Sequence, residues 1–366
     1  MSIQTINIVL FGKGNVGTTL INQILESQTF FENSRNINIQ FAVIANSQKG
    51  LFLRNDLTEN WQDLFENAAD LYEFQDILDF CNQQGLENLV AIDATASTEI
   101  ISKYDSLVKA GFHIIAANKI ANTVSQAFYD NLRRTLETEK RQFLYATNVA
   151  AGLPIISTVR NLYSAGDQIT KIRGVFSGTL SYIFNRFGAE DSTFSQIVIE
   201  AENAGYTEPD SRQDLSGNDV ARKLLVLARE LGLDAEFEEV VVNSLLPAGI
   251  SLDSPKSTYS LSKELFDKPY QIAKLAQNPN CVLRYIGELD VQNRKLEVKL
   301  VSEPIASPLG QLKGTDNLVE IFTVSYGENP IIIQGAGAGK EVTARGILSD
   351  LLQLSHSIMV CELQYA

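Results

Sequence analysis

Short apolar runs alternate with helical patterns along the first 150 residues. Five of the runs have the length and composition of buried strands: 6–12, 38–46, 88–97, 112–119 and 142–148. Apolar residues at helical spacing lie between them, first in NVGTTLINQILES at 15–27. Apolar strands separated by amphipathic helices are typical of a parallel sheet that is covered on both faces. The pattern therefore predicts a doubly wound α/β domain over residues 1–148.

The pattern changes after residue 149. Helical spacing occurs around 150–166, 179–187, 194–205 and 260–277, and strand-like runs occur at 169–178, 281–291, 295–304, 318–326 and 329–335. This mixture predicts a second, α+β domain over 149–339. A last helix, about 341–357, follows the glycine run GAGAGK, and we expect the segment 340–366 to complete the first domain.

Composition excludes several classes of protein. The chain carries 30 Lys and Arg against 44 Asp and Glu, a formal charge of −14, which argues against nucleic acid or an anionic membrane as partner. Three distant cysteines outside any CxxC pair and two histidines predict neither a disulfide framework nor a zinc cluster. The N-terminus lacks the pattern of a signal peptide, and no apolar run is long enough for a membrane span. We therefore expect a cytoplasmic protein.

A glycine motif joins the first predicted strand to the first predicted helix. Gly12, Gly14 and Gly17 match GxGxxG, with Asn15 and Val16 between the last two glycines. In this context Gly12 permits a tight turn, Gly14 lets the backbone approach a pyrophosphate, and Gly17 lets the helix pack on the sheet. The helix N-terminus would then face the phosphates. A tight strand–helix turn that binds no ligand is the alternative.

Further polar residues follow the predicted strands, where ligands of open α/β sheets bind. The second strand is followed by Asn46, Ser47 and Lys49, without the carboxylate that usually holds the ribose of NAD. Ser47 and Lys49 can accept a 2′-phosphate, so NADP(H) is favoured and NAD(H) is the alternative, although Lys49 is equally a solvated loop residue.

The next two strand ends also carry candidates. Thr95 and Ser97 lie where they could line the nicotinamide side of a bound dinucleotide. Lys119 lies where an ammonium group could reach the reacting centre, but its position alone favours a surface lysine.

The stretch GYTEPDSRQDLSGNDVARKLLVLARE, residues 205–230, gathers carboxylates before a helix. Asp219 and Lys223 are four residues apart, so they share a face beside the apolar stripe of the helix. Asp214 or Ser216 could cap its start. An exposed Asp–Lys pair is the usual outcome of this spacing, with little effect on stability. The other outcome is a half-buried lysine that can exchange a proton.

Six motifs, in order, resemble those of homoserine dehydrogenases. They are GKGNVG, AANKIAN, TNVAAGLP, GVFSGTLSYIFN, GYTEPDSRQDLSGNDVARK and NPIIIQGAGAGKEVTA, and they cover nearly the whole chain. The resemblance implies a Rossmann-type, doubly wound NAD(P)-binding domain and a second domain that binds substrate and dimerises. It also implies the reversible, NAD(P)-dependent reduction of L-aspartate 4-semialdehyde to L-homoserine on the route to threonine, methionine and isoleucine.

The same resemblance assigns roles to residues. Lys223 is similar to the family's acid–base lysine and Lys119 to its helper, while Glu208 resembles the acceptor of the substrate ammonium. Other matched positions are the substrate residues Asp214, Asp219, Gly178, Thr179 and Tyr206, the cofactor residues Gly337 and Gly339, and the main-chain sodium ligands Ala146, Val149, Ala151 and Leu153. Asp210 alone is expected to be a solvated loop residue.

Two features depart from many relatives. Lys13 lies inside the glycine motif, where it adds charge near the pyrophosphate or points into solvent. Neither an aspartokinase part nor an ACT-type regulatory part accompanies the six motifs, so we expect a monofunctional enzyme without feedback by threonine. A related oxidoreductase with another amino-acid substrate and a catalytically silent nucleotide-binding regulator are the alternatives, and intact Lys119, Asp219 and Lys223 argue against the second.

Overall fold

The chain folds into two compact units. The structure, a computed structural model, describes residues 3–254 and 263–365. Side chains are described for all of these except residues 263–264 and 359–365. Unit 1 comprises Met1–Asn148 together with Gly339–Ala366, and unit 2 comprises Val149–Ala338. The C-terminal segment therefore returns to the unit formed by the N-terminus.

Unit 1 is built on a seven-stranded sheet of order β4-β3-β2-β1-β5-β6-β7. Its strands are β1 Gln4–Phe11, β2 Ile37–Ala45, β3 Lys49–Phe52, β4 Asp70–Leu71, β5 Leu89–Asp93, β6 His113–Ala116 and β7 Phe143–Leu144. Strands β2, β1, β5, β6 and β7 are parallel, whereas β3 and β4 add an antiparallel edge. The parallel sheet predicted from the apolar runs is confirmed.

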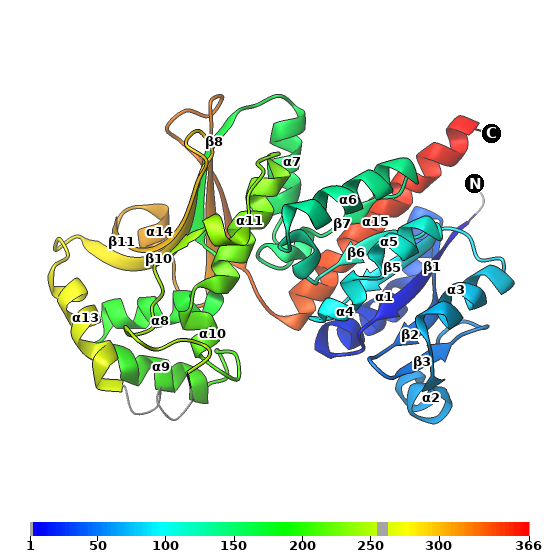
Figure 1. Ribbon diagram of the computed structural model, residues 1–366, viewed down its shortest axis with the longest axis horizontal. Coiled ribbons are helices and arrows are strands. Elements are labelled where there is room, and N and C mark those ends of the chain that lie inside the picture. The colour runs from blue at the N-terminus through cyan, green and yellow to red at the C-terminus, as the bar shows by residue number, and fades with distance from the viewer. Residues whose placement is uncertain (1–2, 255–262, 366) are drawn as a thin grey trace. The chain divides into compact units, whose positions relative to one another are not determined.

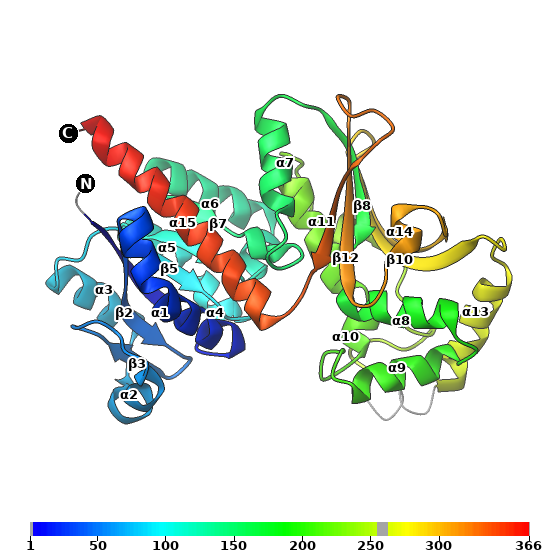
Figure 2. The same ribbon diagram turned by 180° about the vertical axis from the view of Figure 1, so that it is seen from behind.

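Helices cover both faces of this sheet (Figure 1). They are α1 Asn15–Arg35, α2 Trp61–Ala68, α3 Phe74–Gln83, α4 Thr98–Ile101, α5 Tyr104–Lys109, α6 Gln126–Thr138 and α15 Lys340–Tyr365, with short 3₁₀ turns η1 Ile120–Asn122 and η2 Ala146–Asn148. Helices α1 and α15 lie side by side on one face, opposite α5 and α6 (Figure 2). Ile347 and Leu351 of α15 share a core with Ile6 and Leu10 of β1, which explains why the chain returns.

Several elements of unit 1 differ from the sequence expectation. The stretch between β2 and β5 holds β3, α2, β4 and α3, for which the apolar pattern gave no prediction. The strand expected at 142–148 shortens to two residues and ends in the turn η2. Helix α15 extends beyond residue 357. Among the described residues, no helix combines the length and apolar character needed to cross a membrane.

Unit 2 contains a six-stranded sheet of order β13-β12-β8-β10-β11-β9, antiparallel except for the short pair β11–β9. The strands are β8 Ile169–Val175, β9 Val241–Val242, β10 Cys281–Asp290, β11 Lys295–Pro304, β12 Asp316–Thr323 and β13 Ile331–Ala336. The helices are α7 Ile155–Ser164, α8 Gly178–Ala189, α9 Phe194–Asn203, α10 Arg212–Leu215, α11 Asn218–Glu230, η3 Phe237–Glu239, α13 Lys263–Leu275 and α14 Pro308–Gln311.

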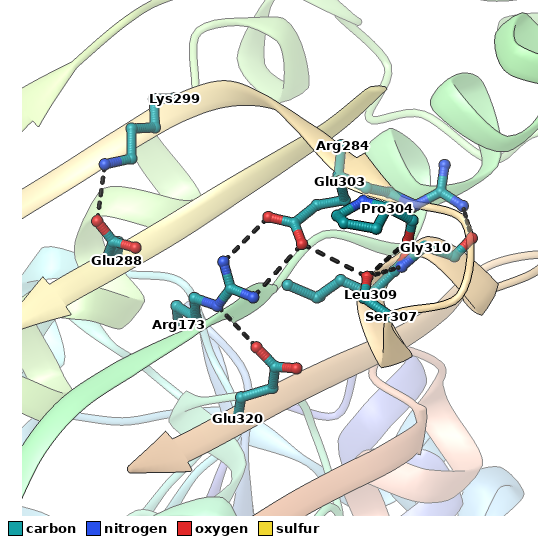
Figure 3. A network of polar contacts seen from close by, with 10 residues as sticks. All are labelled: Arg173, Arg284, Glu288, Lys299, Glu303, Pro304, Ser307, Leu309, Gly310 and Glu320. Atoms are coloured by element: carbon teal, nitrogen blue, oxygen red, sulfur yellow. Dashed lines mark hydrogen bonds and ion pairs between the residues drawn. The ribbon is translucent and has the colours of Figure 1, made fainter. Parts of the chain in front are cut away.

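Helices α8 and α11 pack against β10. At Gly287 a Cβ atom would lie 3.0 Å from the side chains of Val220 and Leu224, so glycine allows α11 to approach the strand closely. A charged network ties three strands together (Figure 3). Arg173 of β8 donates to Glu303 of β11 at 3.0 Å and to Glu320 of β12 at 2.7 Å. Because these charges are largely buried, the pairing geometry constrains how the strands assemble.

Candidate active site

The glycine motif forms the turn from β1 into α1. Gly12 has φ +99°, and a Cβ atom there would lie 2.9 Å from Cγ2 of Thr95. At Gly17 a Cβ atom would lie 1.9 Å from the Gly12 carbonyl oxygen, whereas nothing lies within 4 Å of the corresponding point at Gly14. The fold therefore requires Gly12 and Gly17, while Gly14 leaves space at the helix N-terminus.

That helix N-terminus can receive an anion. Gly14 is the N-cap residue, and no side chain caps the helix. The first N–H groups of an α-helix lack partners within the helix, so those of Asn15 and Val16 suit a phosphate. The glycine motif thus has both the free space and the backbone N–H donors that a pyrophosphate needs.

A cavity of about 300 Å³ lies at the carboxyl ends of β1, β2 and β5. Five predicted cofactor residues line it: Gly12, Asn46, Ser47, Thr95 and Ser97. The structure adds the aromatic side chains of Tyr72 and Phe74, together with Ile100 and Lys103. Its size and mixed lining fit part of a small-molecule ligand, such as an adenosine group.

The loop after β2 contributes to this cavity through its backbone. The Asn46 side-chain oxygen accepts hydrogen bonds from the backbone N–H groups of Gln48 and Lys49, at 2.8 and 2.7 Å. Tyr72 donates its hydroxyl to the Asn46 carbonyl at 3.0 Å. Asn46 therefore shapes the loop that presents Ser47.

Some of the charges around the cavity oppose the binding of a 2′-phosphate. Lys49 is the first residue of β3, not a loop residue, and it is not among the residues that line the cavity. Two carboxylates, Glu73 and Glu99, line it instead. Burial, followed by the charge of Glu99, raises the pKa of Tyr72. This acidic contribution was not foreseen from the sequence.

Lys13 does not simply point into solvent, and its charge near the pyrophosphate stays a prediction. Its Nζ lies 2.6 Å from Oε1 of Glu66 on α2 and 4.1 Å from the ring centroid of Phe65. The ammonium group of Lys13 lowers the pKa of Glu66, and Lys49 contributes in the same direction. The glycine motif is therefore fastened to α2 by a pair that solvent can still reach.

The other strand-end candidates lie in short turns. The Thr95 hydroxyl accepts from the backbone N–H of Ser97 at 3.1 Å, and the Ser97 hydroxyl caps α4 by accepting from Glu99. Lys119 is partly buried and immediately precedes η1. All three belong to unit 1 and follow β5 or β6, as the sequence predicted.

Lys223 occupies a buried position on α11 in unit 2. It is 7% exposed, its Nζ donates to the carbonyl oxygen of Phe176 at 2.7 Å, and it pairs with Asp219 Oδ2 at 2.7 Å. Half of the Asp219 side chain is exposed, so the pair lies at the boundary between core and surface. An ammonium group has three donors, so these contacts leave one N–H for a ligand oxygen.

Several predicted substrate residues contact one another in the loop that precedes α11 and at the start of α8. The Thr179 hydroxyl donates to the Tyr206 carbonyl at 2.6 Å, and the backbone N–H of Glu208 donates to Asp214 Oδ2 at 2.9 Å. Burial, reinforced by the neighbouring carboxylates Glu208 and Asp219, raises the pKa of Asp214. The Glu208 side chain is left exposed, where it can meet a cationic group.

One expectation about this loop is wrong, and another is borne out only in part. Asp210 is not solvated, because it receives hydrogen bonds from Nε and Nη2 of the buried Arg212, at 2.9 and 2.7 Å. The prediction that Ser216 caps the start of α11 is borne out in part. Its hydroxyl accepts from the backbone N–H of Asn218, the first residue of the helix, at 3.2 Å, although Ser216 is not the N-cap residue. That residue is Gly217, with φ +78°, where a Cβ atom would lie 2.3 Å from the Tyr285 hydroxyl. The positive φ and the close approach of Tyr285 therefore favour glycine at the N-cap position.

The remaining matched glycines have local structural roles. Gly178 is the first residue of α8, and a Cβ atom there would lie 2.9 Å from the Thr315 carbonyl. At Gly337 a Cβ atom would lie 2.1 Å from the Asn317 amide carbon. Gly339 has φ +121° and directly precedes α15. Whether they contact a cofactor stays a prediction.

The sodium ligands also stay a prediction. Ala146 begins η2 in unit 1, whereas Val149, Ala151 and Leu153 belong to unit 2. Ala151 has a left-handed backbone with φ +51°, so the chain turns sharply at one predicted carbonyl. In the part of the chain that the structure describes, no three His, Cys, Asp or Glu side chains form a metal-binding group.

Some functional candidates escaped the sequence reasoning. Tyr72 and Phe74 lie in the stretch between β2 and β5, whose pattern gave no element to place them on. Asp93 and Asn118, at the ends of β5 and β6, hydrogen bond to each other. A signal was present for both, since Asp93 is the only charged residue of LVAID and Asn118 directly precedes Lys119.

One unit has a parallel sheet with an open glycine turn, and the other buries a lysine beside carboxylates. Together these features define a dinucleotide-binding protein of the dehydrogenase class. Comparison with family models specifies it further. Residues 12–146 match the NAD binding domain of homoserine dehydrogenase, and residues 154–352 match the homoserine dehydrogenase model. The chain belongs to the homoserine dehydrogenase family.

Individual relatives agree with this assignment. Over 360 residues, 97% of this chain, it is 39% identical to a chloroplastic bifunctional aspartokinase/homoserine dehydrogenase of Zea mays, of which it covers 39%. The chain thus spans about two fifths of the length of the curated relatives it matches. A crystal structure of a Candida auris protein of unknown function is 30% identical, with a TM-score of 0.87 and coverage of 96% and 99% of the two chains.

The fold also recurs in an archaeal protein. A hyperthermophilic archaeal homoserine dehydrogenase, solved in complex with NADPH, gives a TM-score of 0.73 at 21% identity, covering 97% of this chain and 98% of that one. At this identity the likeness concerns the fold alone.

Proposed function

We propose that this chain catalyses the reversible, NAD(P)-dependent reduction of L-aspartate 4-semialdehyde to L-homoserine in threonine, methionine and isoleucine biosynthesis. The observation that carries the proposal is Lys223, held by Phe176 and Asp219 within the segment that the homoserine dehydrogenase model matches. The open glycine turn supports the binding of a dinucleotide.

The dinucleotide, when bound, donates or accepts the hydride. Lys223 carries the proton. In the reductive direction its Nζ–H donates to the substrate oxygen as negative charge develops there, and in reverse it accepts the hydroxyl proton. Phe176 and Asp219 fix the position of Nζ, which limits the reorganisation needed during proton transfer.

The remaining residues bind and orient the substrate. We infer that the exposed Glu208 carboxylate accepts the substrate ammonium group and that Asp214 orders Glu208 through its backbone N–H. Thr179 and the Tyr206 backbone form the adjoining wall. Lys119 keeps the helper role that the family resemblance implies.

NADP(H) is the favoured cofactor in this proposal. Ser47 lines the cavity at the end of β2, and Lys49 and Lys13 supply positive charge near Glu66. The carboxylates Glu73 and Glu99 act in the opposite direction. The ratio of kcat/KM for NADPH and NADH measures the balance. A tenfold advantage for NADH would contradict the role given to Lys49.

The activity has a direct test. Purified protein is incubated with L-aspartate 4-semialdehyde and NADPH, and the loss of absorbance of the reduced nicotinamide is followed. We expect turnover, with L-homoserine as product by chromatography and with the reverse reaction from L-homoserine and NADP⁺. No turnover in either direction, at any enzyme concentration and with either dinucleotide, would reject the proposal.

We also propose a homodimer. β13 is an edge strand of the sheet in unit 2, and its Ile332 is 44% exposed. Unpaired edges with exposed apolar residues are suited to association with another chain. Light scattering after size exclusion measures the mass, and Ile332→Lys should shift it toward the monomer. A monomeric wild-type protein would refute this part.

Sodium dependence and location are further parts of the proposal. Activity measured in sodium and in choline salts tests the predicted carbonyl site at Ala146, Val149, Ala151 and Leu153. The cytoplasmic location is checked by cell fractionation.

A further inference from the structure

A buried carboxylate collects three hydrogen bonds at the carboxyl end of β5. Asp93 is 1% exposed. Its Oδ2 accepts from the Tyr104 hydroxyl at 2.7 Å and from Asn118 Nδ2 at 3.0 Å, and its Oδ1 accepts from the backbone N–H of Thr95 at 2.8 Å. The three donors come from α5, from the turn after β6 and from the turn after β5 itself.

Asn118 extends this contact to the two turns that carry cofactor candidates. Its side chain is buried, and Nδ2 also donates to the Ser97 carbonyl at 2.9 Å. Its Oδ1 accepts from the backbone N–H of Ile120 at 3.1 Å. One amide thereby joins the turn after β5 to the backbone on both sides of Lys119.

The chemistry of these contacts requires an acceptor with two oxygens. Tyr104, Asn118 and Thr95 all donate, and an ionised carboxylate is the side chain that only accepts. The three partners are neutral, and burial raises the pKa of the Asp93 carboxyl. Keeping a carboxylate in such a place opposes folding unless its hydrogen bonds are satisfied. An apolar strand end would avoid that cost, so the arrangement calls for a role beyond stability.

We propose that Asp93 and Asn118 are positioning residues that hold Thr95, Ser97 and the Lys119 backbone in the geometry that a nicotinamide dinucleotide requires. This inference rests on the proposed function. The contact with Tyr104 is different. Tyr104 belongs to α5, so its hydrogen bond to Asp93 involves neither the turn after β5 nor the turn after β6.

The difference between the two partners supplies a matched experiment. Asn118→Leu and Tyr104→Phe each remove one hydrogen bond to the same oxygen of Asp93 and nearly conserve volume. We expect both to lower Tm. At 25 °C, Asn118→Leu should raise the KM and the Kd for NADPH and lower kcat, each by about tenfold, because small misplacements of binding groups are costly. The KM for aspartate semialdehyde should change less than about threefold, and Tyr104→Phe should leave all constants within about twofold.

Two outcomes would overturn the inference. One is an Asn118→Leu enzyme whose kinetic constants and NADPH affinity stay within about twofold of wild type, as those of Tyr104→Phe should, which would make the network purely structural. The other is an equal loss in both variants. If Asn118→Leu does not fold, Asp93→Asn replaces it, since an amide keeps one acceptor oxygen and must mispair with at least one donor. A loss of NADPH affinity no larger than in Tyr104→Phe would again refute positioning.

Failure of the proposed function is distinguishable from failure of this inference. NADPH binding can be followed by the fluorescence of Trp61, the single tryptophan, which lies in unit 1. A wild-type protein that binds NADPH without turning over aspartate semialdehyde would reject the reaction. The Kd comparison between Asn118→Leu and Tyr104→Phe would still decide the positioning role.

Discussion

The two units assemble their functional groups by different routes. In unit 1 most candidates follow parallel strands: Gly12 follows β1, Ser47 follows β2, Thr95 follows β5 and Lys119 follows β6. In unit 2 the candidates come from the start of α8, a loop and α11, and the Lys223 ammonium is held by a carbonyl 47 residues away. Parallel topology places successive strand ends at one edge, whereas the cluster in unit 2 depends on how helices pack on an antiparallel sheet.

This difference assigns dinucleotide binding to unit 1 and proton transfer to unit 2. Substitutions in the turns of unit 1 should act mainly on dinucleotide binding, and substitutions at the lysine of unit 2 should act mainly on turnover. Each of the following measurements can break or sharpen that distinction.

The largest effect is expected at Lys223. Lys223→Ala removes the proton donor, so kcat should fall by about 10²- to 10⁴-fold while the Kd for NADPH changes less than about twofold. Arg222→Ala is the control, because Arg222 is the exposed neighbour on the same helix and should leave kcat unchanged. Steady-state kinetics and fluorescence titration measure both. Near-wild-type turnover would remove Lys223 from the chemistry, and a large loss of NADPH affinity would break the distinction between units.

The glycines of unit 1 should separate folding from binding. Gly17→Ala places a methyl group against the Gly12 carbonyl, so we expect a loss of about 1–3 kcal/mol in stability. Dinucleotide affinity should fall with it. Gly14→Ala has free space and should keep Tm within about 2 °C, yet weaken NADPH binding, because the methyl group occupies the approach of the pyrophosphate. Calorimetry and titration check both variants. Equal affinity in wild type and Gly14→Ala would contradict the pyrophosphate site.

Acid should destabilise unit 1 through His113, at the amino end of β6. Burial lowers its pKa from 6.5 to about 4, so the unfolded chain takes up a proton at higher pH than the folded one. The fold is therefore unaffected above about pH 6.5 and loses stability as pH falls toward 4. Between pH 7.5 and pH 5, the free energy of unfolding of His113→Asn should therefore fall by about 1–2 kcal/mol less than that of the wild type.

Unit 2 provides the contrast for this pH dependence. Asp214 has a raised pKa, so its protonation favours the folded form as pH falls. Chemical denaturation at several pH values, with wild type and His113→Asn compared, isolates the histidine. An identical acid dependence in the two proteins would exclude His113 as the cause.

The smallest effect is expected at the ion pair on the glycine motif. Glu66→Gln removes the charge that neutralises Lys13 and also interacts with Lys49. NADPH affinity should rise about two- to fivefold at low salt and return toward the wild-type value at high salt, because exposed charges are screened. The NADH affinity should change less. Isothermal titration at two salt concentrations measures this, and an unchanged NADPH affinity at low salt would show that neither lysine acts on the phosphates.

The predictions from sequence succeeded where local pattern and topology coincide. The parallel strands of unit 1 and the five longer strands of unit 2 were recognised because their apolar runs are bounded by polar turns. The stretch between β2 and β5 was missed, since its strands have four and two residues and its helices only eight and ten. Tyr72 and Phe74 were missed with it.

Side-chain partners were harder to predict than elements. The spacing of Asp219 and Lys223 indicated an ion pair, and the pair is present. The same reasoning left Asp210 in solvent, because nothing in its neighbourhood along the chain shows that Arg212 is buried against the carbonyls of Ser251 and Ser254. Burial depends on segments distant in sequence.

The sequence by itself determined the alternation of strands and helices, the glycine turn and the order of the motifs, because these depend on residues close together along the chain. Only the tertiary structure decided which groups are buried and paired. Lys223 meets the Phe176 carbonyl, Asn118 joins two turns through Asp93, and Lys13 is fastened to Glu66. The physical reason is that a hydrogen bond or ion pair depends on the separation and burial of two groups in space, which packing sets and sequence spacing does not.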